Sequence, residues 1–216
     1  ANQIQRAGKR GAKLTADLLS FSKKQPAKQK MCDLNQLVKV GNDMLYKILT
    51  PRIELKLNLF SGLWPVKIDL GAFEDALLNM SINAMHAMPS GGTLTISTSN
   101  IKLLEPAAES VNLVAGDYVS FAMEDTGCGM SAELVANIFD PYFTTKGKEG
   151  SGLGLSQVYG FAKSSGGGID VLSVPGVGSR FTLYFPHEVS AIMPIKNPSA
   201  SSAEDFRGIE TILVVD

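Results

Sequence analysis

The stretch from Asp69 to Met88 restricts the possible folds of this chain more than any other segment, because its pattern predicts one helix with both an apolar and a polar surface. Most of its circumference is apolar, through Phe73, Leu77, Leu78, Met80, Ile82, Ala84, Met85 and Met88. One polar stripe interrupts that surface, formed by residues that recur every three or four positions and so share one helix face: Asp75, Asn79, Asn83 and His86. Such a helix must lie against a core.

The polar stripe is open to two interpretations. Amides on a largely buried helix cost free energy unless they find partners, so the stripe either faces water or contacts a polar ligand. The Asn side chain offers a hard carbonyl oxygen, which Mg²⁺ accepts as a ligand beside phosphate oxygens. The periodicity alone does not decide between the two.

The patterns on either side of this helix predict the fold class. Further helices are expected over 34–49 and 153–165, with one short helix in the otherwise irregular stretch 131–150. Strands are expected over 52–60, 64–68, 93–100, 118–124, 168–174 and 179–186. This order predicts a two-layer α/β (α+β) sandwich, in which a mixed, mostly antiparallel sheet carries its helices on one face.

The two ends of the chain have different patterns. The apolar residues of the first segment follow a heptad seam that ends by Pro26: Ile4, Ala7, Gly11, Leu14, Leu18 and Phe21. The same segment is strongly basic, which indicates either a solvated helix face or a docking surface for an acidic partner. We expect a helix over 1–30, a domain over 31–187, a Ser/Ala/Pro-rich linker over 188–207 and an apolar strand over 208–216.

Composition excludes several function classes. A net charge of −1 gives no argument for binding nucleic acid or an anionic membrane. Cys32 and Cys128 are far apart and have no metal-ligand spacing, as expected in a reducing cytoplasm. No apolar run approaches the ~20 residues that a membrane-spanning helix needs, so we expect a soluble, cytoplasmic polypeptide whose parent can still be membrane-anchored.

Two glycine-rich motifs suggest contacts with a ligand. Asp125-Thr-Gly-Cys-Gly-Met130 follows a predicted strand, where a carboxylate can accept a hydrogen bond from an exocyclic amine such as that of adenine. Gly150-Ser-Gly-Leu-Gly-Leu155 directly precedes a predicted helix, whose free N–H groups suit phosphates. The alternative for the first motif is a plain Asp-Gly turn. The second motif fits neither the Walker nor the dinucleotide fingerprint, because it lacks the P-loop lysine and does not follow a strand.

Between these motifs lies Ile138-Phe-Asp-Pro-Tyr-Phe-Thr-Thr-Lys146, an aromatic anchor followed by a cationic stretch. This composition suits a lid that closes over nucleotide phosphates, with Lys146 as the charge partner. A packed surface loop is the alternative for the aromatic residues.

In their order and spacing, these pieces resemble the catalytic domain of histidine kinases, within the superfamily that also includes gyrase and MutL. The similarity covers roughly residues 33–187. Its motifs are similar to the family's N box, first glycine box, F box, second glycine box and closing strand: Leu78–Ala84, Asp125–Gly129, Phe139–Lys146, Gly150–Leu155 and Gly178–Pro186.

The resemblance implies a site for ATP and Mg²⁺. Asn83, assisted by Asn79, would hold Mg²⁺, and these two residues with Lys146 would form the catalytic group. Asp125 would bind the adenine amine in a pocket shaped by Gly127 and Gly129, with Thr182 nearby. The phosphates would meet Lys146, His86 and the second glycine box: Gly150, Ser151, Gly152, Leu153, Gly154 and Leu155.

The resemblance also implies a reaction. Where the ATP-hydrolysing relatives have a glutamate that activates water, this chain has Asn79, and an amide is no general base. We therefore expect transfer of the ATP γ-phosphate to a histidine of a two-component sensor kinase, and from there to a receiver aspartate. The alternatives are a conformational ATPase of the gyrase/MutL kind and a degenerate regulatory nucleotide-binding domain. Asp75 stands where kinases of the family commonly have glutamine, and no role follows from it.

Neither histidine of the chain, His86 or His187, resembles the phosphoacceptor. Residues 1–24 resemble the second helix of the family's dimerisation hairpin, and Ile212–Asp216 resembles the first strand of a receiver domain. We therefore expect a hybrid kinase that is a homodimer when full length. The 216-residue chain on its own would bind ATP without phosphorylating itself.

Overall fold

The computed structural model describes residues 28–145 and 150–188 of the 216-residue chain. The hairpin helix, most of the linker, the receiver strand and the lid residue Lys146, all expected from the sequence, lie outside these described residues. Those expectations stay predictions.

A five-stranded sheet forms one layer of the domain, with its strands in the order β2-β4-β5-β7-β6. Their bounds are Ile53–Leu59 for β2, Gly92–Leu103 for β4, Gly116–Asp125 for β5, Gly168–Val174 for β6 and Gly178–Pro186 for β7. β2 and β4 pair in parallel, whereas the other neighbours pair antiparallel. A parallel pair needs a crossover connection, and here that connection contains the central helix.

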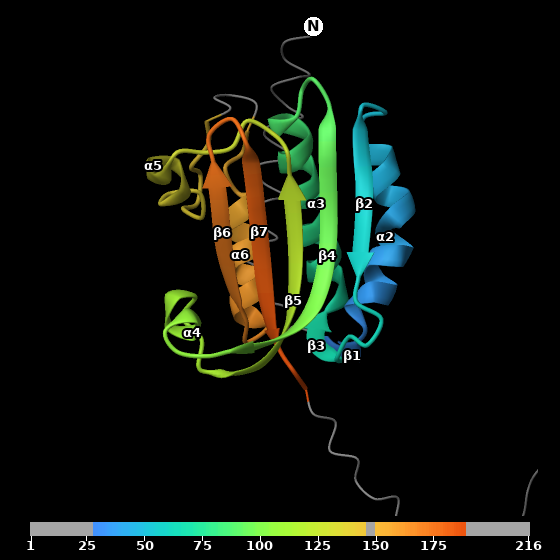
Figure 1. Ribbon diagram of the computed structural model, residues 1–216, viewed down its shortest axis with the longest axis vertical. Coiled ribbons are helices and arrows are strands. Elements are labelled where there is room, and N and C mark those ends of the chain that lie inside the picture. Colours follow the sequence, from blue (N-terminus) through green and yellow to red (C-terminus); the bar gives the residue numbers. More distant parts are fainter. Residues whose placement is uncertain (1–27, 146–149, 189–216) are drawn as a thin grey trace, which may run out of the picture.

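Three helices form the second layer and cover one face of the sheet (Figure 1): α2 (Leu34–Ile48), α3 (Leu70–Ala87) and α6 (Gly154–Ser164). The predicted two-layer sandwich with a mixed, mostly antiparallel sheet is confirmed. The start of α3 is also as predicted, because the Asp69 carboxylate accepts a hydrogen bond from the Ala72 N–H at 3.0 Å. This cap satisfies one of the N–H groups that the first turn leaves without a helical partner.

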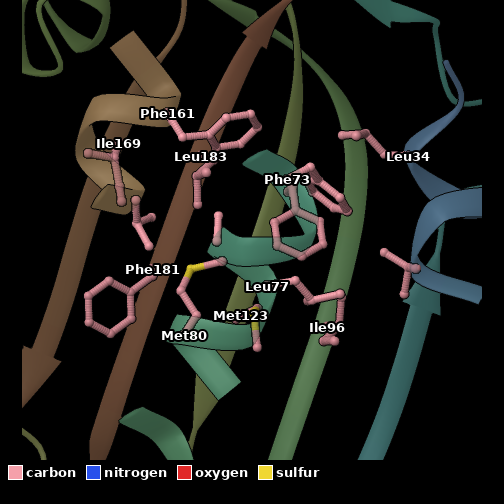
Figure 2. Packing of buried hydrophobic residues seen from close by; sticks show 14 of the residues in the cluster. Leu34, Phe73, Leu77, Met80, Ile96, Met123, Phe161, Ile169, Phe181 and Leu183 are labelled. Carbon is pink, nitrogen blue, oxygen red and sulfur yellow. The ribbon is translucent and has the colours of Figure 1, made fainter. Parts of the chain in front are cut away.

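The core lies between α3 and the sheet. Phe73, Leu77 and Met80 project from α3 into it and are at most 3% exposed. Figure 2 shows these side chains facing Met123, Leu183 and other residues of the central strands. The Phe73 ring meets Phe121 edge-on, with ring centroids 5.3 Å apart. The apolar part of the α3 surface therefore anchors the helix, and Asn79 of its polar stripe faces α6.

A two-stranded sheet at one end of the domain was not predicted from the sequence. β1 (Gln29–Cys32) pairs antiparallel with β3 (Val66–Asp69), and the Lys28 N–H donates to Asp69 Oδ2 at 3.0 Å. The expectation of a helical unit over 1–30 is therefore wrong for residues 28–30, of which the last two belong to β1. β1 is short and its partner is distant in sequence, so its strand character arises from pairing and not from local pattern.

The last described residues return to the same place. His187 stacks on Trp64, with ring centroids 4.3 Å apart and an interplanar angle of 18°. The Glu188 N–H donates to the Pro65 carbonyl at 3.3 Å, directly before β3. The described domain thus begins and ends on one short segment.

Two short helices complete the described domain. α5 (Ala132–Val135) matches the short helix expected in the irregular stretch 131–150. α4 (Ala107–Ser110) was not predicted, and its connection crosses the face of the sheet opposite the other helices (Figure 1). It is held by a separate small cluster of buried residues: Leu103, Ala108, Val111 and Tyr118.

Candidate functional site

The polar stripe of α3 meets the first turn of α6. The Asn79 side chain donates from Nδ2 to Gln157 Oε1 at 3.0 Å, so the two helices are joined by a hydrogen bond between side chains. A Cβ placed on Gly154 would lie only 3.3 Å from Asn79 Oδ1. Asn79 and Asn83 are half-buried, whereas Asp75 and His86 are exposed. At Asn79, the stripe therefore faces the second glycine motif and not bulk water.

The capping of the first turn of α6 bears on the predicted anion site. Its N-cap residue, Leu153, makes no side-chain capping bond, and the nearby Ser151 hydroxyl accepts only a long bond of 3.4 Å from the Leu153 N–H. The first N–H groups of a helix carry a partial positive charge and have no helical acceptor. The N-cap residue therefore leaves these N–H groups without a cap of its own, as the predicted anion site requires.

Gly152 joins this motif to the aromatic segment before the lid. Its φ is +68°, and a Cβ there would clash with the backbone of Tyr142. The Tyr142 N–H donates to the Gly152 carbonyl at 3.0 Å. A side chain at position 152 would therefore separate the second glycine motif from the F-box segment.

The aromatic residues of that segment divide into anchors and an exposed ring. Phe139 and Phe143 are partly buried and pack against the main core, and the Phe139 ring lies 5.4 Å from that of Tyr159 on α6. Tyr142 is 57% exposed. The surface-loop interpretation is thus correct for the packing of the anchors. The lid remains a prediction, since Lys146 lies outside the described residues.

Asp125 lies at the end of β5, where the following loop packs beside the C-terminal end of α3, and is 6% exposed. One carboxylate oxygen accepts the Gly127 N–H at 2.9 Å. Burial raises the pKa of Asp125, and the neighbouring Glu124 adds to this, whereas backbone hydrogen bonds from Gly127 and Ser179 lower it. A buried, backbone-oriented acceptor of this kind is suited to a polar hydrogen on a flat ligand.

The backbone packing of the domain requires glycine at positions 127 and 129. A Cβ on Gly127 would lie 2.6 Å from the Ala87 carbonyl at the end of α3. Gly129 has a φ of +63°, and a Cβ there would overlap the Val174 carbonyl. These glycines let the loop after β5 pack between α3 and the β6–β7 turn, and this loop geometry gives Asp125 its surroundings.

The fold does not place Thr182 next to Asp125. Ser179 is the residue paired with Asp125, so these two share one face of the sheet. Thr182 is three residues further along β7 and so lies on the opposite face, where it pairs with Ala122 and Asp170.

Ser179 was missed by the sequence reasoning. It is 6% exposed, and its hydroxyl lies 2.9 Å from that of Ser173 on β6. The signal that could have found it is the Gly178-Ser179 pair at the start of the closing strand, where the strand register reaches the end of β5.

Gln157 is the second residue that sequence reasoning missed. It follows the second glycine motif by two positions, and no composition rule marks a helical glutamine there.

In the described part of the chain, no helix is long and apolar enough to span a membrane.

Comparison with known proteins agrees with these motifs. Residues 69–189 match the family model described as histidine kinase-, DNA gyrase B- and HSP90-like ATPase. The sensor kinase CckA of Brucella abortus (strain 2308) is 38% identical over 226 residues, which cover 99% of this chain and 23% of that protein. The sensor histidine kinase ZraS of Klebsiella oxytoca is 31% identical over 176 residues, covering 81% of this chain and 35% of that protein. The chain thus spans well under half the length of these relatives.

Solved structures share the fold. The crystal structure of full-length ShkA in complex with AMPPNP superposes with a TM-score of 0.68 at 23% identity, covering 86% of this chain and 37% of that one. The mycobacterial sensor histidine kinase MprB gives a TM-score of 0.57 at 20% identity, covering 73% of this chain and 97% of that one. The family match extends over more than half of the chain and includes α3, both glycine motifs and the closing strand. The chain therefore belongs to the histidine kinase-, DNA gyrase B- and HSP90-like ATPases, and it contains an ATP-binding catalytic domain of the sensor histidine kinase type.

Proposed function

We propose that this domain binds Mg²⁺-ATP and passes the γ-phosphate to a histidine on a helical hairpin of the same parent protein, from which a receiver aspartate takes it. The observation that carries the proposal is that α3 presents the amide of Asn79 to the start of α6. Hydrolysis would need a water-activating carboxylate at the position of this amide. Phosphoryl transfer depends mainly on positioning and on neutralising charge, and both can be supplied without a general base in this domain.

The nucleotide would lie along the side of α3 that faces the two glycine motifs. At one end, the Asp125 carboxylate would accept the exocyclic amine of adenine, with Ser179 beside it. At the other end, the N–H groups at the start of α6 would receive the phosphates. The bound AMPPNP of the structurally similar ShkA supports a nucleoside triphosphate as the ligand of this fold.

The residues present fit Mg²⁺. The donor set offers the side-chain oxygens of Asn79 and Asn83 on one helix face, and Mg²⁺ commonly takes one or two protein oxygens together with phosphate oxygens and water. Within residues 28–145 and 150–188, no group of three or more His, Cys, Asp or Glu side chains could form a full protein cage for a metal. When bound, Mg²⁺ would neutralise charge on the phosphates, while His86 and Lys146 would add cationic contacts.

The wider assembly is also part of the proposal. The relatives are sensor kinases by name, and the chain covers only part of their length. An acceptor hairpin before the domain, a receiver after it and a homodimeric parent would supply the histidine, the aspartate and the symmetry. A cytoplasmic location and the absence of a nucleic-acid partner remain expectations from composition.

Calorimetric titration with Mg²⁺-ATP tests the site. The unmodified chain should bind, and Asn83→Ala and Asp125→Ala should weaken binding by at least about tenfold, the size expected for losing one charge-assisted contact. Asn58→Ala and Glu109→Ala are matched controls, because both residues are exposed and remote from the site. Equal binding by all five proteins would contradict the assignment.

Transfer is tested separately. The chain incubated with radiolabelled ATP should remain unlabelled, and addition of a hairpin that carries the acceptor histidine should produce an acid-labile phosphohistidine. Steady release of phosphate in the absence of any hairpin would instead support a conformational ATPase.

A further inference from the structure

We infer that Gln157 is a positioning residue for the metal–nucleotide site, because it determines which end of the Asn79 amide points toward the phosphates. This inference rests on the proposed function, in which the Asn79 oxygen assists Mg²⁺. Gln157 would touch neither the nucleotide nor the metal and would act through Asn79.

The direction of the hydrogen bond sets the orientation of the Asn79 amide. Asn79 Nδ2 donates to Gln157 Oε1 at 3.0 Å, so the nitrogen of the amide is turned toward Gln157 on α6. An amide nitrogen offers no lone pair to a cation, whereas the amide oxygen does. Directing the nitrogen to Gln157 therefore leaves the oxygen as the atom available to Mg²⁺ or to its water.

The position of that oxygen favours the same orientation. Asn79 Oδ1 lies so close to the first residue of α6 that a Cβ on Gly154 would approach it to 3.3 Å. The start of a helix carries partial positive charge, which favours the oxygen over the NH₂ group at this place. A flipped amide would lose the bond to Gln157 and present two hydrogens to the end where the phosphates and metal belong.

Rigid elements hold both partners of this hydrogen bond. Asn79 projects from α3, whose neighbours Phe73, Leu77 and Met80 are anchored in the core. Gln157 lies in the first turn of α6, where its N–H donates to the Leu153 carbonyl at 3.0 Å. Partners that orient a metal ligand typically change metal affinity by about 10- to 100-fold when they are removed.

The experiment compares two variants of similar side-chain length in the whole chain. Gln157→Glu keeps an acceptor for Asn79 Nδ2, whereas Gln157→Met removes it. The affinity for AMPPNP is measured by calorimetry in Mg²⁺ and again in EDTA, and the readout is the ratio of the two dissociation constants. Thermal unfolding without nucleotide checks that both variants fold.

For Gln157→Met, we expect the Mg²⁺-dependent gain in affinity to fall about tenfold, while binding in EDTA stays as in the unmodified chain. Gln157→Glu should keep the gain at or above its original size, since its added charge weakens nucleotide binding in EDTA more than in Mg²⁺. In an Asn79→Ala background, Gln157→Met should change the ratio no further, because the residue acts only through Asn79.

Other outcomes overturn the inference in distinguishable ways. Equal losses in Mg²⁺ and in EDTA would make Gln157 a structural contact between helices. A Glu variant as damaged as the Met variant would mean that the bond runs in the reverse direction. If Asn79→Ala loses the Mg²⁺ gain and Gln157→Met does not, this inference fails and the proposed function stands. If the unmodified chain binds no nucleotide in either buffer, both fail.

Discussion

Asp125 at the end of β5 lies directly opposite Ser179 at the start of β7, and both side chains are 6% exposed on the helix-covered face of the sheet. The carboxylate accepts a hydrogen bond from the Gly127 N–H in its own loop, and the backbone of Ser179 across the strand pair also lowers its pKa. Two segments that are distant in sequence therefore fix one acceptor. This arrangement orients Asp125 before any ligand arrives.

The raised pKa of Asp125 predicts a stability effect with a defined sign. Because the folded-state pKa lies above the ordinary value of 3.8, the folded state binds the proton more tightly than the unfolded state. The stability from this group is full below that value and is lost as the pH rises through the folded-state pKa. The unfolding temperature of Asp125→Asn minus that of the unmodified chain should therefore increase between about pH 4 and pH 7, as measured by calorimetry. A difference that decreases over this range would contradict the assignment.

The same substitution should change base preference. Asp125→Asn replaces an acceptor with a side chain that also donates, so ATP should bind about 10- to 100-fold more weakly, which corresponds to about 1.5–3 kcal/mol. ITP, which carries an oxygen in place of the adenine amine, should be affected far less. Competition titrations of the two nucleotides measure the ratio, and an unchanged ratio would remove Asp125 from the base pocket.

Gly129→Ala should be strongly destabilising. An alanine Cβ would overlap the Val174 carbonyl at a φ of +63°, so left-handed strain and a backbone clash add to about 2–5 kcal/mol. Gly176→Ala is the control: its φ is +78°, but a Cβ there meets nothing within 4 Å, so only about 1–2 kcal/mol is expected. Urea unfolding compares the two. Similar losses would show that the contact with Val174 is unimportant.

Gly154→Ala should separate stability from binding. Alanine in a helix gains about 1 kcal/mol over glycine, which offsets part of the crowding against Asn79. We expect little change in unfolding free energy but several-fold weaker Mg²⁺-nucleotide binding. Gly160→Ala, on the exposed side of the same helix with no atom within 4 Å of its Cβ, should stabilise by about 0.5–1 kcal/mol and leave binding unchanged. Normal binding by Gly154→Ala would argue against close packing of α6 on Asn79.

Leu77→Ala should test the core under the polar stripe. Leu77 is 1% exposed, and truncation of a buried leucine costs about 2–5 kcal/mol. Val40→Ala, at a position 77% exposed on α2, should change the stability by less than about 0.5 kcal/mol. A loss below about 1 kcal/mol for Leu77→Ala in urea unfolding would contradict the packing in Figure 2.

The two cysteines should react at very different rates. Burial, with a smaller contribution from Asp33, raises the pKa of Cys32 to about 11, so little thiolate is present near neutral pH. Cys128 is exposed. Iodoacetamide at about pH 7.5 should therefore label Cys128 first, as read by peptide mass spectrometry. Preferential labelling of Cys32 would show that β1 does not protect it.

The elements that could be predicted from the sequence are those determined by local periodicity and caps. The Asp69 cap, the apolar surface of α3 and the strand over 168–174 are all present in the structure as expected. The glycine motifs also lie where expected, at the end of β5 and the start of α6. Each of these signals resides in neighbouring residues, where propensity and pattern agree.

What the sequence could not predict depends on long-range register. β1 becomes a strand only because β3 offers it an edge, and Ser179 rather than Thr182 faces Asp125 because the β5–β7 register places it there. The role of Gln157 requires knowing that α6 packs on α3. The ligand roles assigned by resemblance to Asn83 and His86, and to Lys146 outside the described residues, remain predictions, whereas Thr182 lies on the face of the sheet opposite to Asp125.

The attachment of both ends of the described domain at residues 64–69 has a mechanical consequence. α3 starts there and runs toward the opposite end of the molecule, where β5 ends at Asp125 (Figure 1). Its 18 residues give an arm of about 27 Å at 1.5 Å per residue. A rotation of about 20° about the Trp64–His187 end would sweep the far end through roughly 9 Å, as a lever of that length requires. The Asp125 end of the domain thus lies about one helix length away from residues 64–69, on which both ends of the described chain meet.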